Sequence, residues 1–399
     1  MLDNNYIFIG DNYDVMSSDD FQNFKNHIDF IYIDPPYNTK NKFSFNDKND
    51  EWYSDIHKRL FIAKQYLNKE GVIFISIDDK ELTSLLLACY DVFGKENFAG
   101  MFITKQSLRS NSKQINVIHE YILCFCKNKK FAPKFYIKRI ADPSESKGIK
   151  QIIKCVKKEF NANGKDSAKN MLGKLIKNYC INNNATWIKN YNNIDEKGNI
   201  YFAKDLSTPG KARTVNIPSI NLHLDPLPSR GWSSDAKFIQ LYKKNRLCFK
   251  AGRPYEIEYL DEAVNNITSI LDFYSRQGTN DLKKLGLEGI FDTPKPVEMI
   301  KFLIRSTLHK DGVILDFYAG SGTTAQSVYE INSEDNFNHK YILIQRKENL
   351  NSKSDVYKKA IELGFSNPSV DDLMLLRINT FLKLKKLPKN YRLIDKGEH

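Results

Sequence analysis

The sequence predicts an α/β protein with a mostly parallel sheet that is interrupted by an inserted domain. Short, mostly apolar runs, each long enough for one strand, occur at 29–33, 72–77 and 312–316. Strands that are apolar on both faces belong to sheets covered by helices on both sides, which favours parallel pairing. This texture weakens between about 127 and 285, where Asn, Lys, Tyr and Gly dominate, and then returns. We therefore expect one α/β domain that a second domain divides in two.

The elements of the first part follow from the strand at 29–33. A helix is expected at 57–67, where apolar residues recur at helical spacing, and Gly71 opens the strand at 72–77. A further strand is predicted at 120–125. The first part therefore alternates strands and helices.

The last part of the chain returns to the same texture. A strand is expected at 312–316, a glycine-rich turn and helix at 320–331, and a further strand at 340–344. The chain is thus predicted to divide into 1–128, an insertion at 129–284, and 285–399 with a helical tail.

The inserted segment carries much of the positive charge. The chain has a net charge of +12, and residues 127–177 contain 15 Lys or Arg against 4 Asp or Glu. A positive balance confined to one segment favours a polyanionic partner such as nucleic acid, although a Lys-rich solvated surface is the alternative. The insertion also contains Trp187, Trp232 and many Tyr and Phe residues. These side chains indicate a folded domain rather than a linker.

Composition argues against several other classes of protein. No apolar run approaches the roughly 18 residues needed to cross a bilayer, and the N-terminus lacks the features of a signal peptide. We therefore expect a cytoplasmic protein with no membrane partner. The six cysteines are too sparse for a disulfide scaffold, and no Cys-x-x-Cys spacing occurs. Buried, reduced thiols and no metal site are predicted.

The loop at 319–325, Ala-Gly-Ser-Gly-Thr-Thr-Ala, follows the strand that ends at Asp316. Its two glycines allow a ligand to approach the backbone, and the following helix N-terminus favours a negative group. Gly320, Gly322 and Ala325 also fit the dinucleotide pattern G-x-G-x-x-A. By itself the loop is ambiguous, because a tight turn without a ligand explains it equally well.

The second loop, Asp34-Pro35-Pro36-Tyr37, ends the strand at 29–33. Adjacent prolines cannot continue a helix or a central strand, so the chain leaves the sheet in a stiff loop. The Asp34 carboxylate, a proline carbonyl and the Tyr37 ring are then fixed at the carboxyl edge, where α/β sheets bind ligands. A rigid turn with Tyr37 as ordinary packing is the alternative.

Together these residues suit group transfer to an exocyclic amine. The N6 lone pair of adenine is delocalised into the ring, which makes the amine a poor nucleophile. Asp34 and the Pro35 carbonyl can accept its two N–H bonds and draw the lone pair towards an incoming methyl group. Tyr37 can stack on a base flipped out of the duplex. Most of the rate gain would come from positioning.

Seven segments of the chain resemble the β group of amino-methyltransferases, in which the cofactor half of the fold comes second. The resemblance is strongest to the modification (Mod) subunits of type III restriction systems and runs over nearly the whole length. The resembling segments are 10–12, 34–39, 71–79, 119–123, 229–232, 292–296 and 315–324.

The resemblance implies a Rossmann-like S-adenosylmethionine-dependent methyltransferase fold, in permuted order, with an inserted target-recognition domain. It implies adenine N6 of double-stranded DNA as target, and it allows a homodimer or a separate restriction subunit as partner. The implied catalytic residues are Asp34, Pro35, Pro36 and Tyr37. The implied cofactor residues are Asp11, Thr293, Lys295, Pro296, Asp316, Phe317, Ala319, Gly320, Ser321, Gly322 and Thr323. The residues expected to bind DNA are Lys154, Lys157, Lys158, Arg230 and Trp232.

The chain departs from the family pattern in two respects. Gln345 stands where many methyltransferases have an acidic residue that binds the ribose hydroxyls, and the chain is short for a type III Mod subunit. The alternatives are a cytosine-N4 methyltransferase, a nicotinamide-dependent oxidoreductase and a DNA-binding protein without catalysis. Asp rather than Ser as the first residue of the 34–37 loop is what the family associates with adenine.

Overall fold

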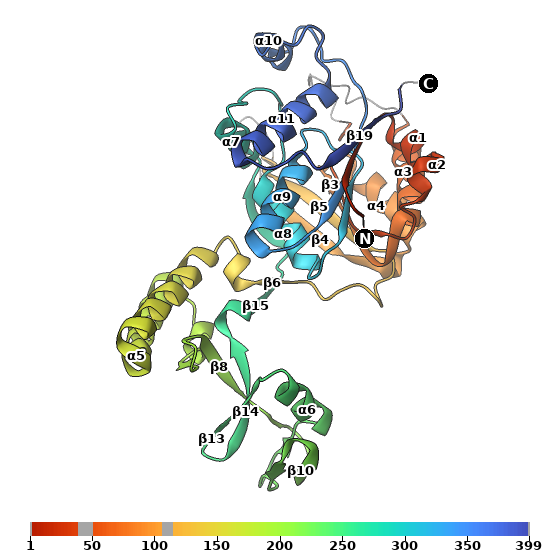
Figure 1. Cartoon of the computed structure of the whole chain (residues 1–399). Coiled ribbons are helices and arrows are strands. Elements are labelled where there is room, and N and C mark those ends of the chain that lie inside the picture. Colours follow the sequence, from red (N-terminus) through yellow and green to blue (C-terminus); the bar gives the residue numbers. More distant parts are fainter. Residues whose placement is uncertain (1, 39–50, 106–114, 398–399) are drawn as a thin grey trace. The chain divides into compact units, whose positions relative to one another are not determined.

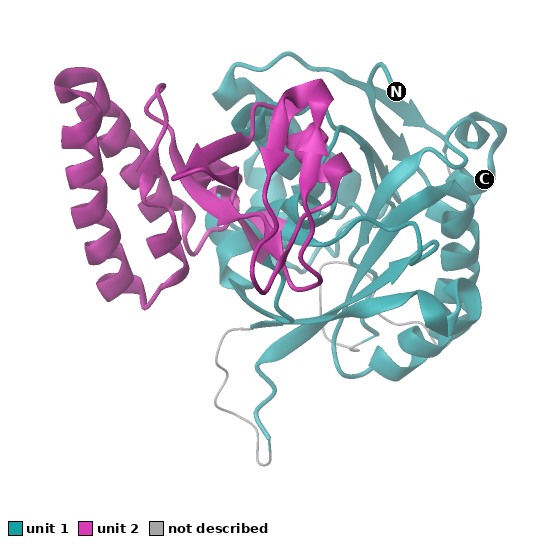
Figure 2. Cartoon of the chain, turned by 90° about the horizontal axis from the view of Figure 1, so that it is seen from below, with its two compact units in different colours: residues 1–136, 266–399 teal, residues 137–265 magenta. Residues whose placement is uncertain are grey.

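The computed structural model describes residues 2–38, 51–105 and 115–397, and the chain forms two compact units. Unit 1 comprises Met1–Tyr136 and Asn266–His399, and unit 2 comprises Ile137–Asn265 (Figure 2). The sequence placed these divisions at 128/129 and 284/285. The second lies earlier than expected because β16 (Ile270–Tyr274) joins the central sheet, which sequence texture did not reveal.

Unit 1 is built on one nine-stranded sheet, seen in Figure 1 behind helices α8 and α9. Its order is β16-β4-β5-β3-β2-β17-β18-β1-β19. Among the described residues, every strand pairing of this sheet is parallel except those of β5, which runs antiparallel to β3 and β4. The mostly parallel sheet is thus confirmed. The other strands are β1 (Asn5–Ile9), β2 (Ile28–Ile33), β3 (Leu67–Ile77), β4 (Phe98–Lys105), β5 (His119–Cys126), β17 (Val313–Asp316), β18 (Lys340–Gln345) and β19 (Tyr391–Asp395).

The centre of this sheet is a topological switch point. β2 pairs with β17 in parallel, with Phe30 opposite Ile314 and Ile31 opposite Leu315. From β2 the chain moves to β3 on one side, and from β17 it moves to β18 on the other. Where neighbouring strands send their connections in opposite directions, their carboxyl ends border a crevice that binds ligands. Both loops singled out in the sequence begin here.

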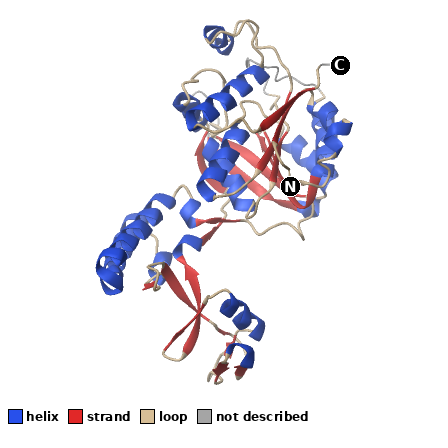
Figure 3. Ribbon diagram, in the orientation of Figure 1, coloured by secondary structure: helices blue, strands red, loops and turns tan. Residues whose placement is uncertain are grey.

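Helices cover the sheet of unit 1 on both sides (Figure 3). Among the described residues no helix has the length and apolar character needed to cross a bilayer. The helices are α1 (Asn12–Ser17), α2 (Asp19–Gln22), α3 (Trp52–Tyr66), α4 (Leu82–Phe93), α7 (Arg276–Lys284), α8 (Val297–Thr307), α9 (Thr323–Asp335), α10 (Asp355–Glu362) and α11 (Val370–Lys385).

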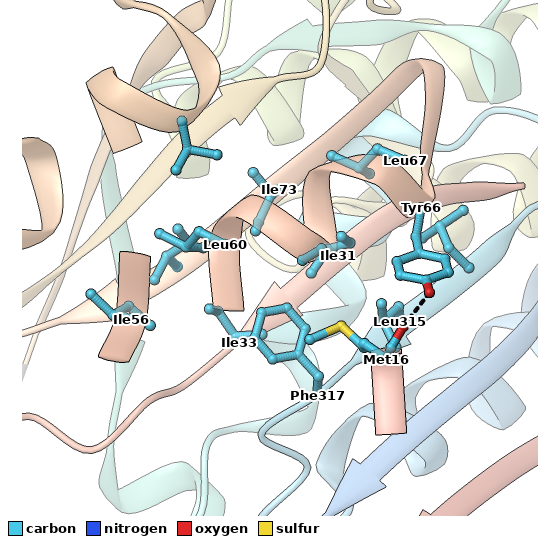
Figure 4. Packing of buried hydrophobic residues seen from close by; sticks show 14 of the residues in the cluster. Met16, Ile31, Ile33, Ile56, Leu60, Tyr66, Leu67, Ile73, Leu315 and Phe317 are labelled. Atoms are coloured by element: carbon cyan, nitrogen blue, oxygen red, sulfur yellow. Dashed lines mark hydrogen bonds between the residues drawn. The ribbon is translucent and has the colours of Figure 1, made fainter. Parts of the chain in front are cut away.

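The main core lies between the sheet and helices α1, α3 and α4. Alternate residues of a strand face the same side, so Ile31 and Ile33 of β2 meet Leu60 of α3 in this core (Figure 4). Tyr66, at the end of α3, is fully buried, and its hydroxyl donates a hydrogen bond to the carbonyl of Met16. The buried hydroxyl is thereby satisfied, and α3 is tied to α1.

The first long element of unit 2 is a helical hairpin that the sequence did not reveal. Helix α5 (Ser146–Asn183) is interrupted at Gly164, whose φ of 81° and ψ of −177° turn the chain back. Apolar residues at helical spacing, including Ile152 and Val156, pack in one core with Leu172 of the second arm. The intervening lysines make this face narrow, which is why the periodicity looks weak along the sequence.

The rest of unit 2 is made of short strands, short 3-10 helices and one α-helix. A four-stranded sheet has the order β13-β14-β8-β7, and three two-stranded sheets pair β6 with β15, β9 with β12 and β10 with β11. The strands are β6 (Tyr136–Lys138), β7 (Asn193–Ile194), β8 (Ile200–Asp205), β9 (Ser207–Thr208), β10 (Val215–Ile217), β11 (Leu222–Leu224), β12 (Gly231–Trp232), β13 (Leu247–Lys250), β14 (Arg253–Tyr259) and β15 (Val264–Asn266), and the helix is α6 (Asp235–Lys243).

Candidate active site

The 34–37 loop leaves the carboxyl end of β2 and is held by the start of α3. The indole nitrogen of Trp52 donates a hydrogen bond of 2.7 Å to the carbonyl of Pro36. Trp52 itself is buried in the main core, which also contacts Tyr37. The Asp34 side chain stays 28% exposed, so the loop presents a carboxylate at the edge of the sheet. Thr39, at the end of the resembling segment, lies outside the described residues.

Four polar side chains from separate parts of unit 1 meet at this loop. The Tyr37 hydroxyl donates to Oδ1 of Asp34 at 2.7 Å. The ammonium of Lys295 donates to the Tyr37 oxygen and to Oε2 of Glu120, both at 2.7 Å, and lies 3.2 Å from Oδ1 of Asp34. Glu120 belongs to β5, and Lys295 precedes α8. The cluster therefore joins two carboxylates, one phenol and one ammonium.

The groups of this cluster change one another's pKa values. The pKa of Asp34 is raised above its usual value, chiefly by burial. The ammonium of Lys295 opposes this shift, and the carboxylate of Glu120 adds to it. Burial opposes the charge of Lys295, but Asp34 and Glu120 outweigh that effect and raise the pKa of its ammonium. Burial, Asp34 and Glu120 together raise the pKa of the Tyr37 phenol well above its usual value. Tyr37 is therefore a neutral hydrogen-bond donor here.

The glycine loop lies at the carboxyl end of the neighbouring strand β17. Gly320 has a φ of +50°, and a Cβ built on it would meet no protein atom closer than the Tyr318 carbonyl oxygen at 3.7 Å. At Gly322 (φ +73°), a Cβ would stand 3.1 Å from Met374 of α11. Gly322 is thus needed for close packing, whereas the space beside Gly320 is open to a ligand.

Asp316 ends β17 and lies under this loop. Only 3% of the residue is exposed, and the carboxylate accepts hydrogen bonds from Thr324 Oγ1 at 2.5 Å and from the Tyr318 amide at 3.1 Å. Burial raises the pKa of Asp316 to about 7, although the two hydrogen bonds oppose it. It forms no ion pair with the Lys, Arg or His residues that the structure describes. A cationic group of a ligand could supply that missing charge.

Gln345 supports the glycine loop from the end of β18. Its Oε1 accepts a hydrogen bond of 2.8 Å from the Gly320 amide, and its Nε2 donates to the Arg346 carbonyl at 2.9 Å. The sequence left open whether Gln345 binds a ribose. The structure shows the amide holding the backbone of the loop, a role for which a carboxamide has both the acceptor and the donor.

Arg377 of α11 lies behind the same loop, and sequence reasoning missed it. The residue is completely buried, and Nη1 donates to Ser321 Oγ at 2.8 Å and to Thr323 Oγ1 at 2.7 Å. Its Nε and Nη2 donate to Gln326 Oε1 at 3.2 and 3.0 Å. Burial lowers the pKa of the guanidinium to about 10. Through these hydrogen bonds Arg377 holds the N-terminal turn of α9 in place, although a single Arg in the middle of a helix gives no sequence signal for this role.

The turn after β1 reaches the glycine loop through Asn12. Asp11 caps α1 by accepting the Tyr13 amide at 2.8 Å, and Arg59 holds both of its carboxylate oxygens at 3.1 and 2.9 Å. The side-chain amide of Asn12 donates to the Phe317 carbonyl at 2.7 Å. Phe317 and Ala319 are both buried. Asp11 therefore stands beside the loop but is already paired with Arg59.

The segment before α8 links the two loops. The carbonyl of Lys295 accepts a hydrogen bond of 3.2 Å from Thr323 Oγ1 in the glycine loop, while its ammonium reaches Asp34. Pro296 is buried as the N-cap of α8, and Thr293 is exposed. The resemblance implied that Lys295 binds the cofactor. The structure instead places its charged group on the 34–37 loop.

In unit 2, the three predicted DNA-binding lysines lie together on the first arm of α5. Lys154, Lys157 and Lys158 line a hollow of about 490 Å³ with Lys150. Lys157 also donates to the carbonyl of Lys197. Four lysine side chains therefore border one hollow on this arm of α5.

Arg230 and Trp232, also expected to bind DNA, have structural partners. Arg230 is exposed and donates to Ser207 Oγ at 2.8 Å and to the Ser207 carbonyl at 3.1 Å. Trp232 is only 6% exposed, packs in a small core with Phe238, and donates its indole N–H to the Asp225 carbonyl at 2.8 Å. The indole is therefore part of the core rather than of the surface.

The basic segment at 127–177 is divided between the units. Residues up to 136 belong to unit 1, where Lys127 donates to Asn26 Oδ1 and Lys129 donates to the Phe98 carbonyl, both at 2.7 Å. Residues 137–177 retain eleven Lys or Arg against four Asp or Glu. The excess of positive charge in unit 2 is thus smaller than expected, because some lysines of the segment belong to unit 1 and form hydrogen bonds there.

The permuted sheet, with an Asp-Pro-Pro-Tyr loop and a glycine loop on adjacent strands, defines an α/β methyltransferase fold. The sequence model of the DNA methylase family (N6/N4 methyltransferases) matches residues 28–354. The chain belongs to this DNA methylase family. The resemblance seen in the sequence is thereby confirmed.

Individual relatives are similar over most of the chain. The EcoP15I Mod subunit of Escherichia coli, a type III restriction-modification enzyme, is 27% identical over 83% of this chain and 57% of its own length. The type II methyltransferase M.KpnI of Klebsiella pneumoniae is 27% identical over 94% of this chain and 86% of its own. The chain therefore spans little more than half of the Mod subunit. Among solved structures, the cytosine-N4-specific PvuII DNA methyltransferase is 12% identical over 99% of this chain and 96% of its own, with a TM-score of 0.44.

Proposed function

We propose that this protein is a site-specific DNA methyltransferase that transfers a methyl group from S-adenosylmethionine to N6 of adenine in duplex DNA. The observation that carries the proposal is the pairing of Ile31 with Leu315. Through it the strand of the Asp34 loop and the strand of the Gly320 loop end side by side at one switch point. Membership of the DNA methylase family gives this crevice its chemistry.

The glycine loop has the features that this cofactor requires. Space is open beside Gly320, and the N-terminus of α9 favours a carboxylate. Asp316 offers a buried carboxylate without a cationic partner among the described residues, which suits the positively charged part of the ligand. When bound, S-adenosylmethionine supplies an electrophilic methyl group, so the protein has to provide positioning rather than a covalent nucleophile.

The 34–37 loop prepares the acceptor amine. Asp34 and the Pro35 carbonyl accept hydrogen bonds from the two N–H groups of the amine, which localises the nitrogen lone pair on one side. Tyr37 offers its ring to a flipped base and so replaces part of the lost stacking. Asp34 can also take up the proton that the amine releases on methylation. The rigid proline pair keeps these groups in one geometry.

Adenine is favoured over cytosine by the first residue of the loop. A carboxylate at Asp34 follows the pattern that the family resemblance associates with adenine N6, whereas Ser is associated with cytosine N4. Cytosine N4 is the second candidate, since the same geometry holds either exocyclic amine. The two candidates differ in a measurable product.

We assign DNA recognition to unit 2 and a restriction–modification system to the biological setting. The lysines of the α5 hollow support the first assignment, because phosphate contacts supply affinity and register. The names of the relatives, a type III Mod subunit and a type II methyltransferase, support the second. A homodimer and a separate restriction subunit are the partners that this setting includes.

The test is to express the protein in a host that lacks DNA methylation and to sequence its DNA with detection of modified bases. We expect N6-methyladenine at one short recognition sequence and no mark from the Asp34→Ala variant. N4-methylcytosine would establish the second candidate, and unmodified DNA from a folded protein would refute both. Replacing unit 2 with that of a relative should move the mark to another sequence while keeping adenine as its base. If the original site stays marked, recognition lies outside unit 2.

A further inference from the structure

We propose that Lys295, held by Glu120, is a positioning residue for Asp34: it orients this carboxylate and keeps it ionised for the target amine. The inference rests on the proposed function and deepens it. It differs from the role that the resemblance implied for Lys295, which was contact with the cofactor.

The first support is the geometry of the ammonium group. Lys295 Nζ lies 2.7 Å from Glu120 Oε2, 2.7 Å from the Tyr37 oxygen and 3.2 Å from Asp34 Oδ1. A lysine ammonium has three N–H bonds, and these three oxygens account for all of them. The side chain is only 14% exposed, so water competes little for these contacts. The ammonium is therefore committed to the 34–37 loop.

The second support is that the backbone of Lys295 is fixed independently. Its carbonyl accepts a hydrogen bond from Thr323, and α7 packs against the preceding residue through Gly278, where a Cβ would stand 1.8 Å from the Pro294 carbonyl oxygen. Asp281 of α7 caps the next residues by accepting the Val297 amide at 3.0 Å. A charge on a rigid segment can orient a neighbouring group with little reorganisation.

The third support is electrostatic need. Asp34 faces the carboxylate of Glu120, the phenols of Tyr32 and Tyr37, and the carboxyl group of Asp316 across the crevice. Burial and Glu120 both favour its protonated form, and among the residues that the structure describes Lys295 is the one ammonium that forms an ion pair with it. A protonated Asp34 would carry an O–H donor on one of its two oxygens, which leaves fewer acceptor positions for the amine. Only the ionised form can take up the proton that the amine releases on methylation.

The same cluster also holds the 34–37 loop in one conformation. The Tyr37 hydroxyl now occupies Oδ1 of Asp34, the acceptor region that the amine needs. When the base arrives, this hydroxyl can leave Asp34 and keep its hydrogen bond from Lys295. Glu120 accepts a hydrogen bond from the same ammonium and so keeps Lys295 from moving when Asp34 binds the amine. Lys295 thus remains in place while Tyr37 changes partner.

The experiment compares Lys295→Met with Lys295→Arg, and Glu120→Ala with Glu120→Gln. Methylation is measured in single turnover, at saturating DNA and S-adenosylmethionine, from pH 5.5 to 9.5, and cofactor affinity is measured by calorimetry. Lys310→Met and Glu70→Gln serve as controls, since these residues form an exposed ion pair in unit 1.

We expect Lys295→Met to lower the rate at pH 7 by about 100-fold, within the range of a misplaced acid–base group. Its acid limb should move up by about one pH unit or more, while cofactor affinity stays within about threefold. Lys295→Arg should retain much of the rate, because a guanidinium restores the charge. Glu120→Gln keeps an acceptor for Lys295 and should outperform Glu120→Ala. The controls should match the wild type.

Two results would overturn the inference. Loss of cofactor affinity in Lys295→Met, with a normal rate at saturation, would return Lys295 to the cofactor site. An unchanged acid limb in the pH–rate profile of Lys295→Met would show that Lys295 has only a structural role. Carbon-13 NMR of labelled aspartate provides a readout that needs neither DNA nor activity: the Asp34 titration should move to higher pH in Lys295→Met, with Asp34→Asn for assignment. If the Asp34 titration moves in Lys295→Met but neither the wild type nor any variant methylates DNA, the proposed function fails. The effect of Lys295 on Asp34 would still stand.

Discussion

Gly278 of α7 lies so close to Pro294 that a Cβ at position 278 would stand 1.8 Å from the Pro294 carbonyl oxygen. This contact sets the position of the next residue, Lys295. A displaced Lys295 would lose its hold on Asp34, and that makes a glycine outside both loops important for activity.

Gly278→Ala should therefore shift the segment before α8 and lower methylation by about tenfold or more. Overpacking a tight contact also destabilises a protein by about 1–3 kcal/mol. Urea unfolding and single-turnover methylation measure the two effects. Gly173→Ala is the matched control, because a Cβ there meets nothing within 4 Å inside helix α5; it should stabilise slightly. Full activity of Gly278→Ala would contradict the close contact.

Asp34→Ala and Tyr37→Ala should nearly abolish methylation while leaving cofactor affinity within a few-fold. The first removes an acceptor for the amine, and the second removes the ring that stacks on the base. Tyr37→Phe keeps the ring and loses only the hydroxyl bound to Asp34, so it should keep most of the rate. Turnover of either alanine variant near the wild-type value on saturating DNA would show that the loop is not catalytic.

Gly320→Val should lose S-adenosylmethionine binding, because its side chain would occupy the open space beside the loop. Valine also strains a residue with positive φ, so the control must share that strain. Gly364→Val does so, since Gly364 has a φ of +96° and no neighbour within 4 Å. Calorimetry should show binding by the control alone. Undiminished binding by folded Gly320→Val would exclude the loop as the cofactor site.

Cofactor affinity should depend on pH through Asp316. Burial raises its pKa to about 7 in the ligand-free protein, and a cationic ligand favours the ionised form. Below pH 7 the carboxyl group must therefore release a proton on binding, and affinity should fall by up to about tenfold per pH unit. Calorimetry in buffers of different ionisation enthalpy measures that proton. A flat profile in the wild type, or the same slope in Asp316→Asn, would exclude Asp316.

Neutralising Lys154, Lys157 and Lys158 with Gln should weaken binding to all DNA sequences alike. Each lost phosphate contact should also reduce the slope of log affinity against log salt by about one. The control neutralises three exposed lysines of unit 1, Lys383, Lys385 and Lys386, and so makes the same change in net charge. If the two triple variants weaken DNA binding equally, net charge alone explains the effect. If neither affinity nor salt slope changes, the three lysines of α5 are only a solvated face.

The sequence was most informative where one residue type has few alternative uses. Two prolines after an apolar strand force the chain out of the sheet, so Asp34 could be placed at its edge. Continuous apolar runs identified β2, β3 and β17, because buried parallel strands need no polar face. Local pattern is sufficient for features of this kind.

Relationships between distant segments were less visible. Glu120 read as part of a strand, and only pairing with β4 and β3 brings it to Asp34. Arg377 is the one charged residue in the middle of α11, and its partners lie more than fifty residues earlier. The residues of β16 follow the insertion directly along the chain but pair with β4 of the central sheet. Such contacts depend on the whole fold, and no short pattern encodes them.

The pairing of β2 with β17 also governs how the protein is made. Residue 31 pairs with residue 315, and at roughly 5–20 residues per second the ribosome needs on the order of 15–60 s to produce the chain between them. During that time the edge of β2 that pairs with β17 has no native neighbour, although β3 can already cover the other edge. Unpaired strand edges promote association between chains. The yield of soluble protein should thus depend on translation speed, temperature and chaperones, even for variants whose folded state is as stable as the wild type.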